Sequence, residues 1–107
     1  MSDDCCELVV TAPDGDWLAG LTTELVQRRL AAVGHLSEIR SIYRWDGVQD
    51  MIEARVALHT RTALVDRIIA EVRARHPYEV PGIWAIPIIV STDDYLAWIT
   101  ESTDAPE

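Results

Sequence analysis

The sequence predicts a single α+β domain of ferredoxin-like topology, in which a β-α-β-β-α-β order builds an antiparallel sheet and one further helix follows. Three observations predict this fold. Short β-branched runs alternate with helical stripes, an Asp-Gly pair joins two long strand patterns, and no repeat or linker interrupts the 107 residues. We therefore expect one domain, residues 1–107, with flexible segments at 1–6 and 103–107.

The first two elements are a short strand and a helix. Residues 7–11 (ELVVT) are a short run rich in β-branched side chains, and Pro13 stops them from continuing as a strand. The turn 14–16 offers two aspartates, either of which can accept hydrogen bonds from the first helical amides. A helix is predicted over 17–32, with Gly34 as its stop signal.

A long hairpin follows, with strands at 36–45 and 48–60. Asp46-Gly47 is a preferred pair for a two-residue turn because both positions tolerate positive φ. The second of these strands alternates clearly, which predicts two faces of different chemistry. One face carries Ile52, Ala54, Val56 and Leu58, and the other carries Met51, Glu53, Arg55, Ala57 and His59.

The last three elements are a helix at 63–75, a strand at 83–90 and a short helix through Tyr95 and Ile99 that residues 91–93 cap. Thr62 is placed to cap the first of these helices, and Pro77 ends it. Pro87 has no amide hydrogen to donate, so the fourth strand should lie at a sheet edge or carry a bulge.

The predicted sheet has more surface and more edge than one chain can cover. Two amphipathic helices cover only one face of a four-stranded sheet, and the long hairpin strands leave unpaired backbone at their ends. Closed self-association is the usual way to satisfy such edges, so the residues alone predict an oligomer.

Composition argues against several partners. The formal net charge is −9, and the nine cationic side chains are all arginine. Such a chain is repelled by nucleic-acid phosphates and by anionic membrane surfaces. The longest apolar run, 83–90, is too short to cross a bilayer, and the first residues lack a basic and then apolar leader. We expect a cytoplasmic protein that binds neither nucleic acid nor membrane.

The two cysteines, Cys5 and Cys6, are adjacent near the start of the sequence. Neighbouring cysteines rarely form a structural bridge, so no disulfide framework is predicted, as in a reducing compartment. Adjacent thiols on a mobile segment would also make a poorly organised site for a soft metal ion.

Three segments together resemble the CutA family of divalent-cation tolerance proteins: 11–14 (TAPD), 41–47 (SIYRWDG) and 76–81 (HPYEVP). The resemblance runs over nearly the whole chain, in the family's order and spacing. Supporting matches are 29–32 (RLAA), Glu53 and 95–98 (YLAW).

The resemblance implies a homotrimer whose sheets pair edge to edge, with the long hairpin and the last helix at the interface. It also implies a role in tolerance to copper and other divalent cations, with a metal ion or small ligand bound in clefts between subunits. Some family members carry thiols at positions occupied here by Val10 and Val33, and the second helix has no cysteine. Copper(I) prefers soft sulfur ligands, so this chain does not keep the soft site.

The metal candidates are His76, which keeps the family's histidine, and Glu79. A neutral imidazole is a common metal ligand. The alternative for His76 is a helix cap, in which its ring bonds a terminal carbonyl beside Pro77. The alternative for Glu79 is a structural one, in a rigid turn between Pro77 and Pro81 where Tyr78 packs.

A second group of residues is assigned to a subunit interface or cleft. Aromatic side chains on a sheet face favour packing or an interface over a ligand site. Glu53 and His59 share a strand face but are separated by six residues, roughly 20 Å at the rise of a strand, so they cannot share an ion within one chain. The assigned residues are Tyr43, Trp45, Glu53, His59, Tyr78 and Trp98.

No catalytic activity is predicted, because no nucleophile lies in a recognisable base-paired motif. Asp14 and Asp16 would repel phosphate from the loop after the first strand, where an acylphosphatase of this fold needs cations. The leading hypothesis is a trimeric protein that binds copper or another divalent cation. The alternatives are a trimeric scaffold without a ligand and a nucleotide-sensing module.

Overall fold

Strands and helices follow one another in the order that the sequence predicts. The structure is a computed structural model that describes residues 4–105. Its elements are β1 (Cys5–Ala12), α1 (Gly15–Gln27), β2 (Val33–Arg44), β3 (Val48–Arg61), a 3₁₀ turn (Thr62–Leu64), α2 (Val65–Arg75), β4 (Ile83–Pro87) and α3 (Asp93–Glu101).

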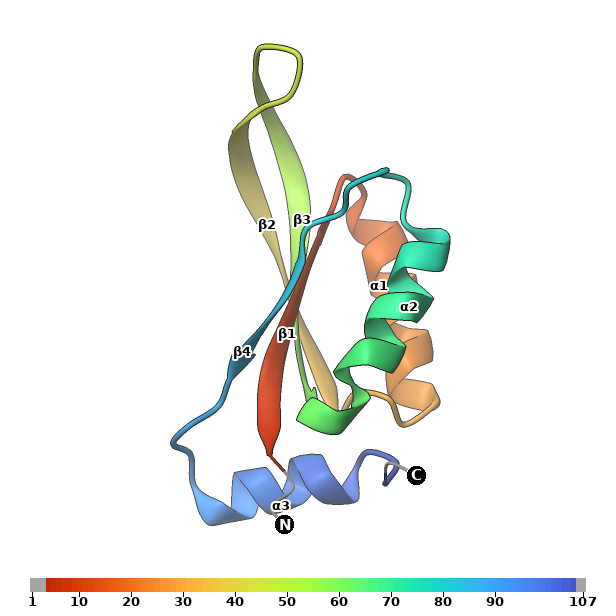
Figure 1. Ribbon diagram of the computed structural model, residues 1–107, viewed down its shortest axis with the longest axis vertical. Coiled ribbons are helices and arrows are strands. Elements are labelled where there is room, and N and C mark those ends of the chain that lie inside the picture. Colours follow the sequence, from red (N-terminus) through yellow and green to blue (C-terminus); the bar gives the residue numbers. More distant parts are fainter. Residues whose placement is uncertain (1–3, 106–107) are drawn as a thin grey trace.

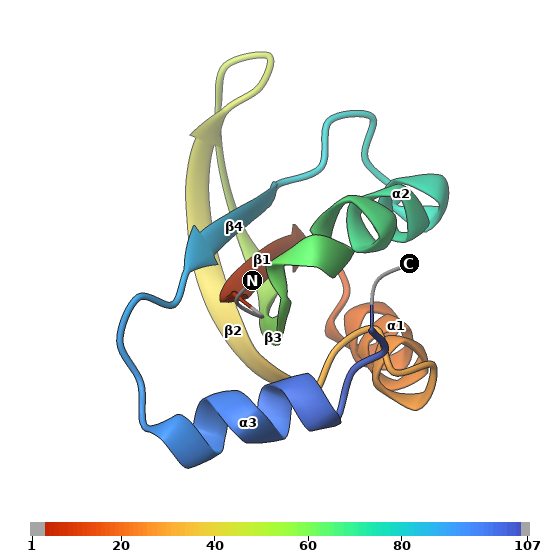
Figure 2. The ribbon, with the colours of Figure 1, turned by 60° about the horizontal axis from the view of Figure 1, so that its bottom comes forward.

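The strands described in residues 4–105 form one four-stranded antiparallel sheet in the order β2-β3-β1-β4. This confirms the ferredoxin-like prediction and places β4, with Pro87, at an edge. Helices α1 and α2 cover one face, and α3 crosses the end of the sheet where β1 begins (Figures 1 and 2). Within residues 4–105, no helix combines the length and the apolar character that a membrane span requires.

The core lies between the sheet and the helices α1 and α2. It is almost wholly aliphatic, so its stability comes from the burial of branched side chains. The alternation of β3 sends Ala54, Val56 and Leu58 into it as predicted, whereas Ile52 lies beyond the helices and is exposed. The buried members are Leu8, Val10, Ala12, Leu18, Leu21, Leu25, Leu30, Ala31, Ala54, Val56, Leu58, Leu64, Ile68 and Val72.

The β2–β3 hairpin projects beyond the rest of the sheet (Figure 1). Asp46 and Gly47 both have positive φ, 53° and 90°, as the predicted turn requires. The turn is nevertheless one residue longer than predicted. Arg44 pairs with Val48, so three residues connect the strands, and the Trp45 amide bonds the Gly47 carbonyl at 2.8 Å. Trp45 therefore belongs to the turn and not to the strand.

Helix α1 ends at Gln27, five residues earlier than predicted. The Arg29 amide bonds the Val26 carbonyl at 3.1 Å and the Leu30 amide bonds the Leu25 carbonyl at 2.9 Å, which is the Schellman ending. Arg29 takes the left-handed position of that motif, with φ 60°, where glycine is usual.

Gly34 lies inside β2 and does not stop a helix. A Cβ atom there would come within 2.4 Å of Thr22 Cγ2, so the glycine allows α1 to pack closely on the sheet. Thr62, expected to cap a helix, instead begins the 3₁₀ turn that precedes α2.

Both segments expected to be flexible contain ordered residues. Cys5 and Cys6 open β1 and are buried, so the expectation of a mobile cysteine pair was wrong. At the other end Thr103 is buried, and Asp104 pairs with the Arg29 side chain at 3.1 Å. Residues 1–3 and 106–107 lie outside the described part. The fourth strand is also shorter than predicted, because β4 ends at Pro87.

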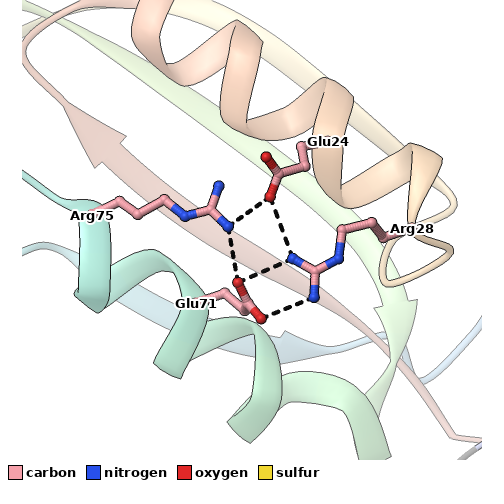
Figure 3. A network of polar contacts seen from close by, with 4 residues as sticks. All are labelled: Glu24, Arg28, Glu71 and Arg75. Carbon is pink, nitrogen blue, oxygen red and sulfur yellow. Dashed lines mark hydrogen bonds and ion pairs between the residues drawn. The ribbon is translucent and has the colours of Figure 1, made fainter.

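An ionic network joins α1 to α2 on the outer surface (Figure 3). Arg28 binds Glu71 through two hydrogen bonds of 3.0 and 3.1 Å, and Arg75 contacts both Glu71 and Glu24. The guanidinium groups lower the pKa of both carboxyls, chiefly through Arg28 at Glu71 and through Arg75 at Glu24.

Because both carboxyl pKa values are lowered by folding, the network stabilises the protein above their ordinary value of 4.5, and this contribution is lost as the pH falls through the folded values. Between about pH 6 and about pH 3, wild type should therefore lose more unfolding free energy than Glu71→Gln. Urea unfolding at fixed protein concentration measures both. The difference between the two proteins in this loss of unfolding free energy should shrink in high salt, because salt screens exposed charges. Equal pH dependence of the two proteins at low salt would contradict the prediction.

Candidate functional site

A cleft of about 470 Å³ opens between the β2–β3 hairpin and the loop that joins α2 to β4. In Figure 1 that loop runs past the point where the hairpin rises above the sheet. We call this space the hairpin cleft. It is lined by Thr11, Tyr43, Trp45, Glu53, Pro77, Tyr78, Glu79, Val80 and Gly82.

His76 fixes the wall of the hairpin cleft that the loop provides. Its backbone amide bonds the Val72 carbonyl at 2.8 Å and so ends α2. Its ring Nε2 donates to the Thr11 carbonyl on β1 at 2.8 Å, and its Nδ1 accepts the Tyr78 amide at 3.0 Å. Trp17 packs edge-on against the ring, with centroids 5.4 Å apart. The imidazole thus ties the end of α2 to the first strand.

These bonds bear on the two metal candidates. Both ring nitrogens of His76 are occupied within the chain, so coordination would require one of the two bonds to break. Glu79 is exposed and lines the hairpin cleft. Among residues 4–105, no cluster of three or more His, Cys, Asp or Glu side chains is arranged to hold a metal ion.

Glu53 and Tyr78 form the polar centre of the hairpin cleft. The Tyr78 hydroxyl donates to Glu53 Oε2 at 2.9 Å, and only 8% of Glu53 is exposed. Burial, reinforced by the hydrogen bond to Glu53, raises the pKa of Tyr78 to about 12. The phenol is thus fully protonated at neutral pH and acts as a donor.

The hairpin contributes two further aromatic side chains to the cleft. The Tyr43 hydroxyl lies 3.1 Å from the sulfur of Met51, which is a weak acceptor. Trp45, in the turn, is 57% exposed. Of the site residues predicted from the sequence, the hairpin cleft brings together Tyr43, Trp45, Glu53, Tyr78 and Glu79, with His76 directly behind them.

The two other predicted residues, His59 and Trp98, lie at the opposite end of the sheet beside α3. His59 Nδ1 is 2.5 Å from the Tyr95 hydroxyl and Nε2 is 2.9 Å from Glu7 Oε2. Because a carboxylate only accepts, Nε2 carries the proton. Tyr95 stacks on Trp98 at 5.6 Å, and the pKa of Tyr95 is raised by burial and by Glu7. These contacts hold α3 to β1 and β3.

Sequence reasoning missed several residues of both groups. Thr11 and Gly82 line the hairpin cleft because the Thr11 amide bonds the Gly82 carbonyl at 3.1 Å, a contact between distant segments. Glu7 lies beside His59 because the register of β1 and β3 pairs them. That register, given the strand order of a ferredoxin-like sheet, was the only signal that would have placed Glu7 there.

A family model described as "CutA1 divalent ion tolerance protein" matches residues 6–102. The chain belongs to the CutA1 family. The chain is 36% identical over 99 residues to the divalent-cation tolerance protein CutA of Thermus thermophilus, with 90% of this chain and 95% of that protein covered. It is 38% identical over 96 residues to the chloroplastic protein CutA of Arabidopsis thaliana. That match covers 88% of this chain but 53% of the plant protein, so the chain spans about half of that relative.

Solved CutA1 structures share the whole fold. The CutA1 protein of Shewanella sp. SIB1 superimposes with a TM-score of 0.91 at 30% identity and covers 98% of this chain and all of that one. The structure of CutA from Archaeoglobus fulgidus, described as a periplasmic divalent cation tolerance protein, gives a TM-score of 0.90 at 29% identity over 94% of this chain and 99% of that one. The family relationship predicted from the three sequence segments is thereby confirmed.

The bond between Tyr78 and Glu53 should support the loop of this CutA1 chain. In Tyr78→Phe the buried carboxylate loses its donor, so we expect unfolding free energy to fall by about 1–3 kcal/mol. Tyr43→Phe is the matched control, because its hydroxyl meets a thioether and its loss should cost far less. Urea unfolding measures both variants, and equal effects would show that Glu53 does not depend on Tyr78.

Proposed function

We propose that this CutA1 chain assembles as a homotrimer through the open edges of its sheet. β2 and β4 are the outermost strands of the sheet in residues 4–105, so each has one edge without a partner strand. Large apolar side chains on or beside both edges are exposed, and burial against another copy would remove them from water. They are Leu36, Ile42, Trp84, Ile86, Ile89 and Val90.

The proposed role is divalent-cation binding at clefts between the subunits, as part of cation tolerance. The observation that carries it is the exposed Glu79 carboxylate on the hairpin cleft, in a chain that supplies no complete ligand set within residues 4–105. A second copy would then provide the remaining ligands for copper or another divalent ion. His76 positions the loop, and it is a ligand only if one of its two ring bonds is exchanged for the metal.

Binding, and not catalysis, is the role we assign. Tyr78, whose pKa is about 12, is not a base at neutral pH, and its hydroxyl already donates to Glu53. We place this activity in the cytoplasm, in keeping with two buried cysteines that form no disulfide.

The assembly is tested by light scattering. Wild type should show three times the 12.0 kDa mass of one chain at micromolar concentration. Ile86→Lys places a charge on β4 and should shift the mass toward one chain. Val26→Lys changes a half-exposed residue on α1 and should leave the mass unchanged. A wild-type monomer would reject the trimer.

The cation site is tested by calorimetric titration of Cu²⁺ and Zn²⁺. Glu79→Gln removes the exposed carboxylate and should weaken binding by about tenfold or more, since a charged ligand is lost. Asp66→Asn changes an exposed carboxylate on α2, outside the cleft, and should bind as wild type does. Unchanged binding by Glu79→Gln would reject the site. A trimer that binds neither ion would favour the scaffold alternative.

A further inference from the structure

The hairpin cleft is lined by aromatic side chains as well as by the exposed Glu79 carboxylate. Tyr43 and Trp45 enter it from the hairpin and Tyr78 from the loop, so aromatic side chains come from two separate segments. The negative face of an aromatic ring attracts a cation within about 6 Å, and most strongly where water is displaced. The volume of about 470 Å³ lies within the range of small-ligand pockets.

Glu53 places a charged acceptor inside this aromatic lining. An ionised carboxylate offers about four lone-pair positions. Tyr78 occupies one of them, and no other side chain or amide in residues 4–105 donates a hydrogen bond to Glu53. No buried side-chain oxygen in residues 4–105 lacks a partner, so the Glu53 oxygen that Tyr78 does not bond is accessible, and an additional N–H group in the cleft could donate to it.

The surrounding charge also favours a cation. No arginine is among the lining residues, whereas Glu79 adds a second carboxylate. Several of the chain's cations are engaged with acidic partners elsewhere: Arg28 and Arg75 with Glu71, Arg29 with Asp104 and Arg40 with Asp50. With a net charge of −9, the chain attracts cationic ligands over distance.

We propose that the hairpin cleft binds a small alkylammonium ion, whose N–H groups donate to Glu53 while its charge and alkyl chain lie against Tyr43, Trp45 and Tyr78. A bare metal ion fits the part of the cleft around Glu53 less well, because the carboxylate there is shared with Tyr78 and the neighbouring side chains Tyr43 and Trp45 are aromatic. A neutral ligand would leave the Glu53 charge unmatched.

This inference does not depend on the metal proposal. The ammonium site uses Trp45 and Glu53 of a single chain, whereas the cation site uses Glu79 and a second copy. Trp45 is not a metal ligand, so Trp45→Leu separates the two: it should impair ammonium binding and leave titration of Cu²⁺ and Zn²⁺ unchanged. Its side chain is 57% exposed, so its replacement leaves the core intact.

The experiment is calorimetric titration of n-butylammonium into the full chain in the presence of EDTA, which removes metal ions. We expect saturable binding of one ion per chain, weakened about tenfold in Trp45→Leu and in Glu53→Gln. Val26→Ala replaces a partly exposed apolar residue on α1, outside the cleft, and should bind as wild type does. Two further probes report on the chemistry: 1-butanol, which has no charge, and tetramethylammonium, which has no N–H group.

Several results would overturn the proposal. They are equal binding of 1-butanol, undiminished binding by Trp45→Leu, or no saturation because a neighbouring subunit fills the cleft. Tetramethylammonium should bind more weakly than n-butylammonium, and equal binding would overturn the contact with Glu53. Glu53→Gln also disturbs the bond to Tyr78, so the unfolding midpoint of Glu53→Gln is measured alongside its binding. If Glu53→Gln proves to be unfolded, the binding of n-butylammonium by Trp45→Leu alone tests the proposal.

Discussion

The antiparallel register of β3 with its two neighbours is the constraint on which the rest of the structure depends. Because successive side chains point to opposite faces, the same strand sends Ala54 and Val56 into the core and Glu53 to the other face. A slip of one residue would bury the carboxylate among aliphatic side chains. The core and the hairpin cleft are thus two consequences of one pairing.

His76 positions the loop that forms one side of the hairpin cleft. Its ring bonds to Thr11 and Tyr78 fix the start of the seven-residue segment between α2 and β4 against β1, and the bond from the Thr11 amide to the Gly82 carbonyl fixes its end. With those bonds in place, the Tyr78 hydroxyl bonds Glu53 and the loop lines one side of the hairpin cleft. The ring of His76, a metal candidate in the sequence, thus has both nitrogens bonded within the chain, where it positions the loop.

Much of this was predictable from local patterns, and the remainder was not. The element order, the hairpin and the Asp14 cap follow from periodicity and turn chemistry, and the Asp14 side chain does accept the Asp16 amide at 2.9 Å. The end of α1 was missed because arginine, not glycine, takes the left-handed position at residue 29. The sequence assigned Tyr43, Trp45, Glu53 and Tyr78 to one group with His59 and Trp98, which lie at the opposite end of the sheet, and it missed Thr11 and Gly82. Distinguishing these two groups requires the strand register and the long-range bond from the His76 ring to the Thr11 carbonyl, and local patterns give neither.

The left-handed turn at Arg29 has a consequence for the order in which parts of the chain fold during synthesis. That backbone conformation is unfavourable by about 1–2 kcal/mol for a residue with a side chain. Here the Arg29 guanidinium donates hydrogen bonds to the Asp104 carboxylate and to the Glu101 carbonyl. The Asp104 amide in turn donates to the Arg29 carbonyl. A ribosome adds Asp104 seventy-five positions after Arg29. The bend after α1 thus lacks these bonds until seventy-five further residues have been added and α3 has docked.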